Sequence, residues 1–133
     1  MLTCNWRAVG VSVLLFAFPY ALIVLSTGLI AHSEATHLAF AVVAYATPLV
    51  VVALIGVGYL AARFAGDSGV ANGAASGLAV TAVLLIGPYV ALNFDLVFSD
   101  YLRVYGPHAL VMGVFCCSLG GLIRELITGF RTA

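Results

Sequence analysis

Lysine is absent from this chain of 133 residues, and charge of either sign is scarce. The five basic residues are all arginine, so a Schiff-base lysine, a phosphate-loop lysine and a catalytic lysine are excluded together. Only 8% of the residues are charged, against roughly 25% in a soluble domain, and the mean hydropathy is +1.19. Because a surface that faces water cannot be built from this supply, the composition indicates a membrane protein.

Cysteine is also sparse and forms no redox motif. Cys4 stands near the N-terminus, while Cys116 and Cys117 are neighbours that point about 100° apart on a helix and cannot close an unstrained disulfide. We interpret this pair as small packing residues. The sequence also lacks a C-x-x-C pair, a glycine-rich phosphate loop, a serine nucleophile beside a base and a basic stripe for nucleic acid. We therefore expect no enzymatic activity, no cofactor, no metal and no nucleic-acid partner.

Charge is missing above all from four long apolar stretches. They lie between Arg7 and Glu34, His37 and Arg63, Asp67 and Asp95, and Arg103 and Arg124. Each holds at least 20 residues, and about 20 are needed to cross the ~30 Å hydrocarbon core of a bilayer. The sequence predicts an all-α fold, an integral membrane four-helix antiparallel bundle in one domain, 1–133. Its expected spans are about 8–31, 38–62, 72–96 and 108–128, with Pro107 in the first turn of the last one.

The arginines predict how the bundle sits in the membrane. Arg7, Arg63, Arg124 and Arg131 fall at one face, and Arg103 is the only basic residue at the other. The positive-inside rule then places both termini in the cytoplasm of a multi-pass protein of the plasma (cytoplasmic) membrane.

A weak internal similarity relates the two halves. Residues 13–15 (Val-Leu-Leu) and Pro19-Tyr20 recur as residues 83–85 (Val-Leu-Leu) and Pro88-Tyr89, at offsets of 70 and 69 residues. The chain could therefore consist of two repeated helical hairpins of the same orientation, although similarity by chance among so few residue types is the rival explanation.

Small residues recur at four-residue spacing and favour close helix packing. Lipid provides no hydrophobic drive between helices, so ridges of small residues let the backbones approach. We interpret these ridges as helix-packing sites, within the bundle or between copies in a homo-oligomer: Gly58, Ala62 and Gly66; Gly69, Gly73 and Gly77; Gly113, Cys117 and Gly121.

Prolines flanked by hydroxyl side chains mark a candidate path at mid-membrane depth. A proline inside a helix kinks it and frees the carbonyl four residues before, which in lipid needs a new partner. The candidate path comprises Pro19, Tyr20, Tyr45, Thr47, Pro48, Pro88 and Tyr89. It fits a small channel or carrier, although no acid or base lies at that depth to couple protons, and prolines are also common as structural kinks.

The predicted outer rim collects the polar residues of the opposite face. It contains every histidine of the chain: the group is His32, Glu34, His37, Asp95, Asp100 and His108. Imidazoles and carboxylates could bind a metal or sense pH, but their spacing matches no strict ligand pattern, and ordinary polar loops at the interface are the better explanation. Asp95 is expected to pair with Arg103. At the inner end, we expect Arg124 to reach the interface and Glu125 to pair with Arg63 or Arg7.

Two segments resemble a known group of proteins. They are Asn5-Trp6-Arg7-Ala8-Val9, and residues 58–62 (Gly-Tyr-Leu-Ala-Ala) continuing through Gly66, Gly69, Asn72-Gly73 and Gly77. About a third of the chain resembles small glycine-zippered haloarchaeal membrane proteins of unknown function. The resemblance implies a helical membrane fold, and it brings no activity that could be transferred to this chain.

The leading hypothesis from the sequence is a non-enzymatic accessory or structural subunit of a larger membrane complex, or a self-associating scaffold. Its partners would be the lipid bilayer and further membrane subunits or copies of the chain. The alternatives are a channel or carrier through the proline and tyrosine path, and a metal or pH sensor at the outer rim.

Overall fold

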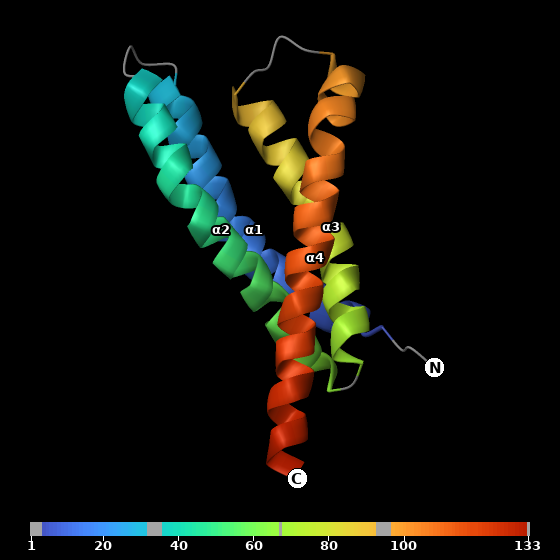
Figure 1. Cartoon of the computed structure of the whole chain (residues 1–133). Coiled ribbons are helices and arrows are strands. Elements are labelled where there is room, and N and C mark those ends of the chain that lie inside the picture. Colours follow the sequence, from blue (N-terminus) through green and yellow to red (C-terminus); the bar gives the residue numbers. More distant parts are fainter. Residues whose placement is uncertain (1–3, 32–35, 67, 93–96, 133) are drawn as a thin grey trace.

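Four helices make up the described parts of the chain (Figure 1). The computed structural model describes residues 4–31, 36–66, 68–92 and 97–132, and it describes side chains for 4–29, 47–66, 68–90 and 97–129. The helices are α1 (Trp6–Ala31), α2 (Thr36–Ala65), α3 (Gly69–Leu92) and α4 (Phe98–Thr132). Each is long and apolar enough to cross a membrane. The expectation of an all-α four-helix bundle is confirmed, and the fold defines a multi-pass helical membrane protein.

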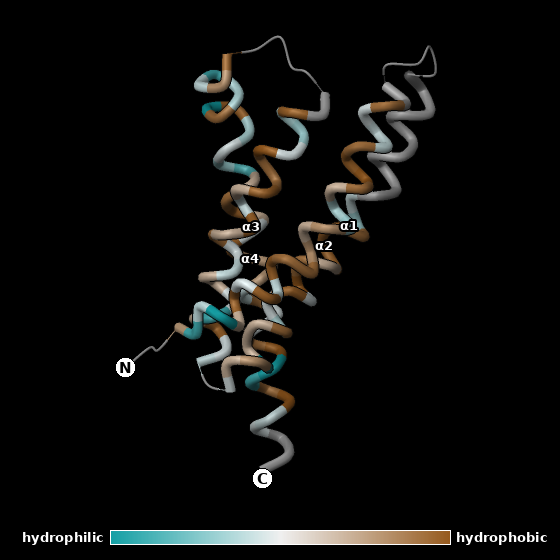
Figure 2. The backbone as a smooth tube through the Cα atoms, turned by 180° about the vertical axis from the view of Figure 1, so that it is seen from behind, coloured by the Kyte–Doolittle hydropathy of each residue, from teal (hydrophilic) through white to brown (hydrophobic). Residues whose placement is uncertain are grey.

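The bundle consists of two helical hairpins that touch along only part of their length. Both termini and the α2–α3 turn lie at one end, and from there the α1/α2 hairpin and the α3/α4 hairpin diverge toward the other end (Figures 1 and 2). We call the half with the termini the terminal half and the other the open half. The helices α2 and α3 each lie close to all the others, whereas the backbones of α1 and α4 stay apart within the described residues.

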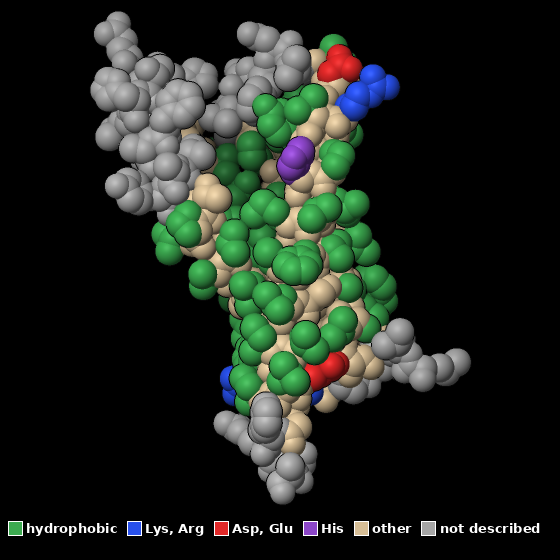
Figure 3. Space-filling model, in the orientation of Figure 1, with side chains coloured by type: hydrophobic (Ala, Val, Ile, Leu, Met, Phe, Trp, Pro, Cys, Tyr) green, Lys and Arg blue, Asp and Glu red, His purple; other side chains and the backbone are tan. Residues whose placement is uncertain are grey.

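Apolar side chains cover the middle of the bundle and charged ones its two ends (Figure 3). Large apolar side chains such as Leu14, Phe18 and Leu29 are more than two-thirds exposed, as expected where lipid replaces water as the solvent. The buried core is small by comparison. It is a cluster in the terminal half that includes Phe16, Leu54, Val57, Val80, Cys116 and Cys117.

The fourth helix corrects one sequence expectation. It begins at Phe98, ten residues before the expected span start, so Pro107 lies inside the helix and not in its first turn. The aromatic side chains of the added turns explain the extension, because Tyr101 packs against Tyr89 at 5.1 Å and against Tyr105 at 4.9 Å between ring centroids. With 35 residues, α4 measures about 52 Å at 1.5 Å per residue, so it reaches beyond a ~30 Å hydrocarbon core.

Candidate functional site: the cleft between the hairpins

Backbone contacts between glycines hold the terminal half together. A methyl group added at Gly58 of α2 would overlap the backbone of Cys117 on α4, and so would one at Gly73 of α3. Gly77 and Gly113 face each other across α3 and α4, as do Gly69 and Gly121. These helices therefore meet at their backbones, with no room for a side chain between them.

The predicted packing ridges mostly lie in these contacts and face α4 from within the chain. Ala62 is fully buried. Gly66 is the exception, because its added Cβ would meet nothing within 4 Å and its φ of +83° places it in the turn after α2. Sequence reasoning missed Gly120, where an added Cβ would overlap the backbone of Ile55 and Tyr59 on α2; the available signal was the Gly120-Gly121 pair. Because the described ridges face one another, they give no support to packing against a second copy.

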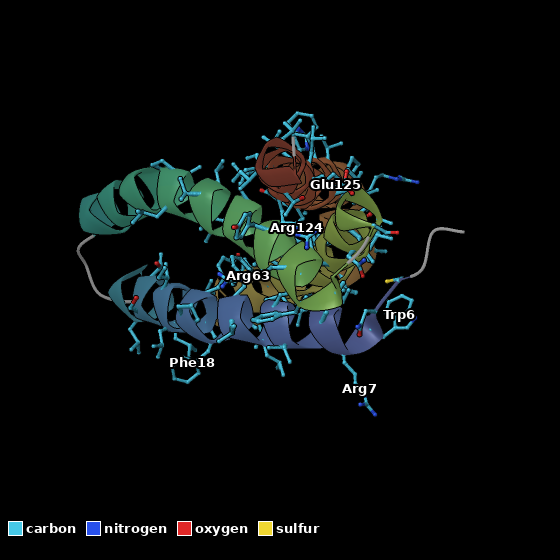
Figure 4. The ribbon with its side chains drawn as sticks, turned by 90° about the horizontal axis from the view of Figure 1, so that it is seen from below. Trp6, Arg7, Phe18, Arg63, Arg124 and Glu125 are labelled. Carbon is cyan, nitrogen blue, oxygen red and sulfur yellow. The ribbon has the colours of Figure 1, made fainter. Side chains whose placement is uncertain are left out.

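Polar groups secure the ends of the helices in the terminal half. Arg124 donates to the carbonyl of Gly66 at 3.3 Å, and Glu125 accepts from the amide of Val70 at 3.1 Å. Adjacent residues of α4 thus stabilise the C-terminus of α2 and the N-terminus of α3, each with the favourable sign for the helix dipole. Glu125 therefore binds a helix N-terminus and not Arg63 or Arg7, while Arg7 and Phe18 point away from the bundle (Figure 4).

A buried asparagine joins the two hairpins beside these caps. Asn72 of α3 is fully buried, and its Oδ1 accepts from the backbone amide of Asn5 at 2.8 Å. Its Nδ2 donates to the carbonyl of Ser68 at 3.1 Å. Asn5 itself caps α1 by accepting from the amide of Ala8 at 3.3 Å. The start of α1 is therefore fixed to the start of α3.

In the open half the same four helices enclose a cleft of about 360 Å³. Figure 3 shows this part of the molecule hollowed between the two hairpins. From the first hairpin it is lined by Tyr20, Ile23, Val24, Thr27, Thr47 and Val50. From the second it is lined by Leu84, Leu85, Pro88, Tyr101, Tyr105, His108, Ala109 and Met112. Tyr20, Val50 and Leu84 also pack against the buried core, which closes the cleft toward the terminal half.

Three polar side chains of the cleft wall are near backbone carbonyls of the bundle. Thr27 donates to the carbonyl of Ile23 at 2.8 Å, and Nδ1 of His108 lies 3.3 Å from the carbonyl of Val104. The hydroxyl of Tyr101 donates to the carbonyl of Leu85 at 3.1 Å. That carbonyl lies in the turn of α3 before Pro88, so this bond joins α4 to the turn in which the proline removes one helical hydrogen bond.

The predicted mid-membrane path is only partly assembled in this cleft. Tyr20, Thr47 and Pro88 line it. Pro19 and Pro48 are exposed on the outside, and Tyr89 packs against Phe98 at 4.9 Å between ring centroids. The side chain of Tyr45 lies outside the described residues.

Sequence reasoning missed the contribution of α4 to the cleft. It did not consider Tyr101 and Tyr105, and it assigned His108 to the rim. The available signal was their spacing, because positions 101, 105, 108 and 112 follow the i, i+4, i+7, i+11 pattern of one helix face.

The predicted rim group is described only in part. His32, Glu34 and Asp95 lie outside the described residues, as does the side chain of His37, so the pairing of Asp95 with Arg103 is not observed. Asp100 lies in the first turn of α4, where a carboxylate is favoured by the helix dipole, and His108 lies on the cleft. Across the described residues, no three His, Cys, Asp or Glu side chains come together as a metal site.

Comparison with known proteins adds no relative to this picture. No family model, no curated protein and no solved structure matches the chain.

Proposed function

We propose that this chain is a non-enzymatic membrane protein that holds a small, mainly apolar molecule from the bilayer in the cleft between its hairpins. One observation carries the proposal: the helices meet at their backbones in the terminal half, yet leave about 360 Å³ between them in the open half. Ligand sites in proteins measure roughly 300–1,000 Å³ and are mostly apolar with a few polar groups, which describes this cleft.

The lining sets the class of molecule that can enter. Its described side chains include no Arg, Lys, Asp or Glu, and among them His108 is the only one that can carry a charge near neutral pH. A charged group placed at hydrocarbon depth without a partner is costly. The cleft therefore favours a neutral, lipid-soluble molecule over an ion or a charged metabolite.

The closed inner end favours a binding site over a continuous pore. The buried core that includes Phe16, Leu54 and Val80 fills the space below the cleft. A channel or carrier would require this core and the glycine contacts around it to part. A transport role through the predicted tyrosine path therefore remains the weaker proposal, to be tested by liposome flux.

A role as an accessory subunit or scaffold remains a second proposal. What supports it is the outward face of α1, where Leu14, Phe18 and Leu29 are 70%, 72% and 77% exposed and could pack against a partner helix in place of lipid. A subunit of a larger complex could bind its ligand in the cleft and its partner on this face. A chain that is monomeric in mild detergent, with nothing co-purifying, would contradict the subunit role and leave the cleft proposal unaffected.

The predicted orientation determines where the molecule would enter. With both termini in the cytoplasm, the cleft lies in the outer leaflet. The resemblance to haloarchaeal membrane proteins stays a prediction, and it does not indicate which molecule would bind in the cleft.

Photolabelling in vesicles tests whether the cleft is occupied. The probe is a 16-carbon alcohol that carries a diazirine in its chain, and mass spectrometry maps the labelled residues. We expect labels to concentrate on the cleft walls of all four helices. Ala109→Phe places a ring in the cleft and should reduce this labelling about tenfold, whereas Ala53→Phe, on an exposed position of α2, should not. Labels spread evenly over the exposed side chains of both variants would overturn the proposal.

A further inference from the structure

We infer that the cleft selects a neutral lipid that carries a hydroxyl or carbonyl oxygen, and that the hydroxyl of Tyr20 is the group that binds this oxygen. The inference rests on the proposed function and adds the chemical class of the ligand. The observation behind it is that Thr27 and Tyr101 on the cleft wall form hydrogen bonds, whereas the hydroxyl of Tyr20 forms none among the described residues.

The hydroxyl of Tyr20 has no hydrogen-bond partner in the described parts of the chain. The hydroxyls of Thr27 and Tyr101 each donate to a backbone carbonyl, and Thr47 also has a polar partner. The ring of Tyr20 stacks on Phe16 at 5.2 Å between centroids with 17° between the planes, and this contact leaves the hydroxyl without a described acceptor or donor. Every fully enclosed side-chain nitrogen or oxygen among the described residues has a hydrogen-bond partner. Because the hydroxyl of Tyr20 has none, it is not fully enclosed, and it can be reached from the cleft that Tyr20 lines.

The depth of Tyr20 makes an unpaired hydroxyl costly. Tyr20 follows Trp6 by 14 residues and precedes Ala31 by 11, so it lies about 21 Å and about 17 Å from the two ends of α1. A hydrocarbon core is ~30 Å thick, which places this residue well inside it. Water is scarce at this depth, so a hydrogen bond to an oxygen of a ligand would offset the free-energy cost of removing the hydroxyl from water.

The Tyr20 ring is held so that its hydroxyl keeps one position. Besides stacking on Phe16, it packs across the hairpin interface against Gly87 of α3, where an added methyl group would sit 3.4 Å from the ring edge. A larger residue at position 87 would press on the ring and on Val24. A donor with little freedom loses less entropy when it binds, which favours recognition of a defined oxygen.

The remaining walls select against charge and against bulk. Within the described part of the chain the lining has no residue that is permanently charged, so a phosphate, a carboxylate or a quaternary ammonium would lie unpaired beside Tyr20. A volume of about 360 Å³ is at the low end of ligand sites, which suits a single-chain lipid better than a two-chain phospholipid. The occupant is therefore a neutral single-chain lipid of the bilayer.

The experiment compares three probes of the same chain length in vesicles of one composition. They are diazirine-bearing 16-carbon molecules that end in a hydroxyl, in a methyl group or in a quaternary ammonium. For the unaltered protein we expect the alcohol to label the cleft roughly fivefold more than the alkane, since one hydrogen bond contributes about 1 kcal/mol. The ammonium probe should label it least.

Tyr20→Phe should abolish the preference for the alcohol and leave labelling by the alkane unchanged. The matched control is Tyr59→Phe, which removes a hydroxyl from α2 outside the cleft and should keep the preference. Gel filtration and thermal unfolding in detergent verify that both variants fold.

The outcomes separate this inference from the function on which it rests. If Ala109→Phe blocks every probe but Tyr20→Phe keeps the preference for the alcohol, the role of Tyr20 is refuted and the cleft stands. Equal labelling by ammonium and alcohol refutes selection for a neutral ligand. If Ala109→Phe changes nothing, the proposed function itself fails.

Discussion

The terminal half and the open half are built from the same four helices, yet they pack in opposite ways. In the terminal half, glycines of α2 and α3 rest on the backbone of α4, and Asn72, Arg124 and Glu125 fix the helix ends. In the open half, aromatic and aliphatic side chains of both hairpins line a cleft between them. Residue size along each helix therefore determines where a small membrane bundle is closed and where it can accept a ligand.

The largest effect is expected where a methyl group would meet backbone. Gly58→Ala puts its Cβ into the backbone of Cys117, and we expect a loss of about 3 kcal/mol or more in the free energy of unfolding. Gly56→Ala is the matched control on the same helix, because nothing lies within 4 Å of its added Cβ. Unfolding in SDS, followed by circular dichroism, measures both variants. Equal stability of the two would show that α2 and α4 are not in backbone contact.

An intermediate effect is expected at the polar connection between the hairpins. Asn72→Ala leaves the amide of Asn5 without its acceptor and should lower the free energy of unfolding by about 1–3 kcal/mol. In Ser26→Ala the lost hydroxyl is exposed and bonds only to Ile23 of its own helix, so a change within about 0.5 kcal/mol is expected. The same SDS titration compares them. A loss at Asn72 no greater than at Ser26 would mean that this connection does not hold α1 to α3.

The smallest effect is expected on the wall of the cleft. Met112→Ala removes atoms that already border open space, so we expect a change of about 0.5 kcal/mol or less in the free energy of unfolding. Labelling by the alcohol probe should persist, because the cleft only becomes larger. A loss of about 2 kcal/mol or more, typical of a buried methionine, would show that the hairpins close on each other in the membrane.

The fold could be predicted from the sequence with few errors, and the errors have physical causes. Long stretches without charge are the segments that can lie in lipid. The number of helices and their order in hairpins could therefore be read from the positions of the Arg and acidic residues between them. The start of α4 was misplaced because Asp100, Arg103 and Pro107 look like a loop when their neighbours are unknown. Packing of Tyr101 on Tyr89 provides the contacts that make these turns helical.

The candidate site was harder to predict because it depends on which helix faces meet. The sequence suggested a path made of prolines inside the helices and of the hydroxyl side chains beside them. Of this group Tyr20, Thr47 and Pro88 do line the cleft. Pro19 and Pro48 were selected on the same ground and face outward, because adjacent residues on a helix point about 100° apart.

Sequence alone determined that the chain is helical, apolar and made of four stretches that can cross a bilayer, because each of these properties depends on residues close together in the chain. Only the tertiary structure decided that the small residues of α2 and α3 turn toward α4, and that the hairpins meet where Gly58 and Gly120 contact the facing backbone but part around the cleft. Both features depend on how each helix is rotated about its axis, and that rotation is set by contacts between residues far apart in the sequence.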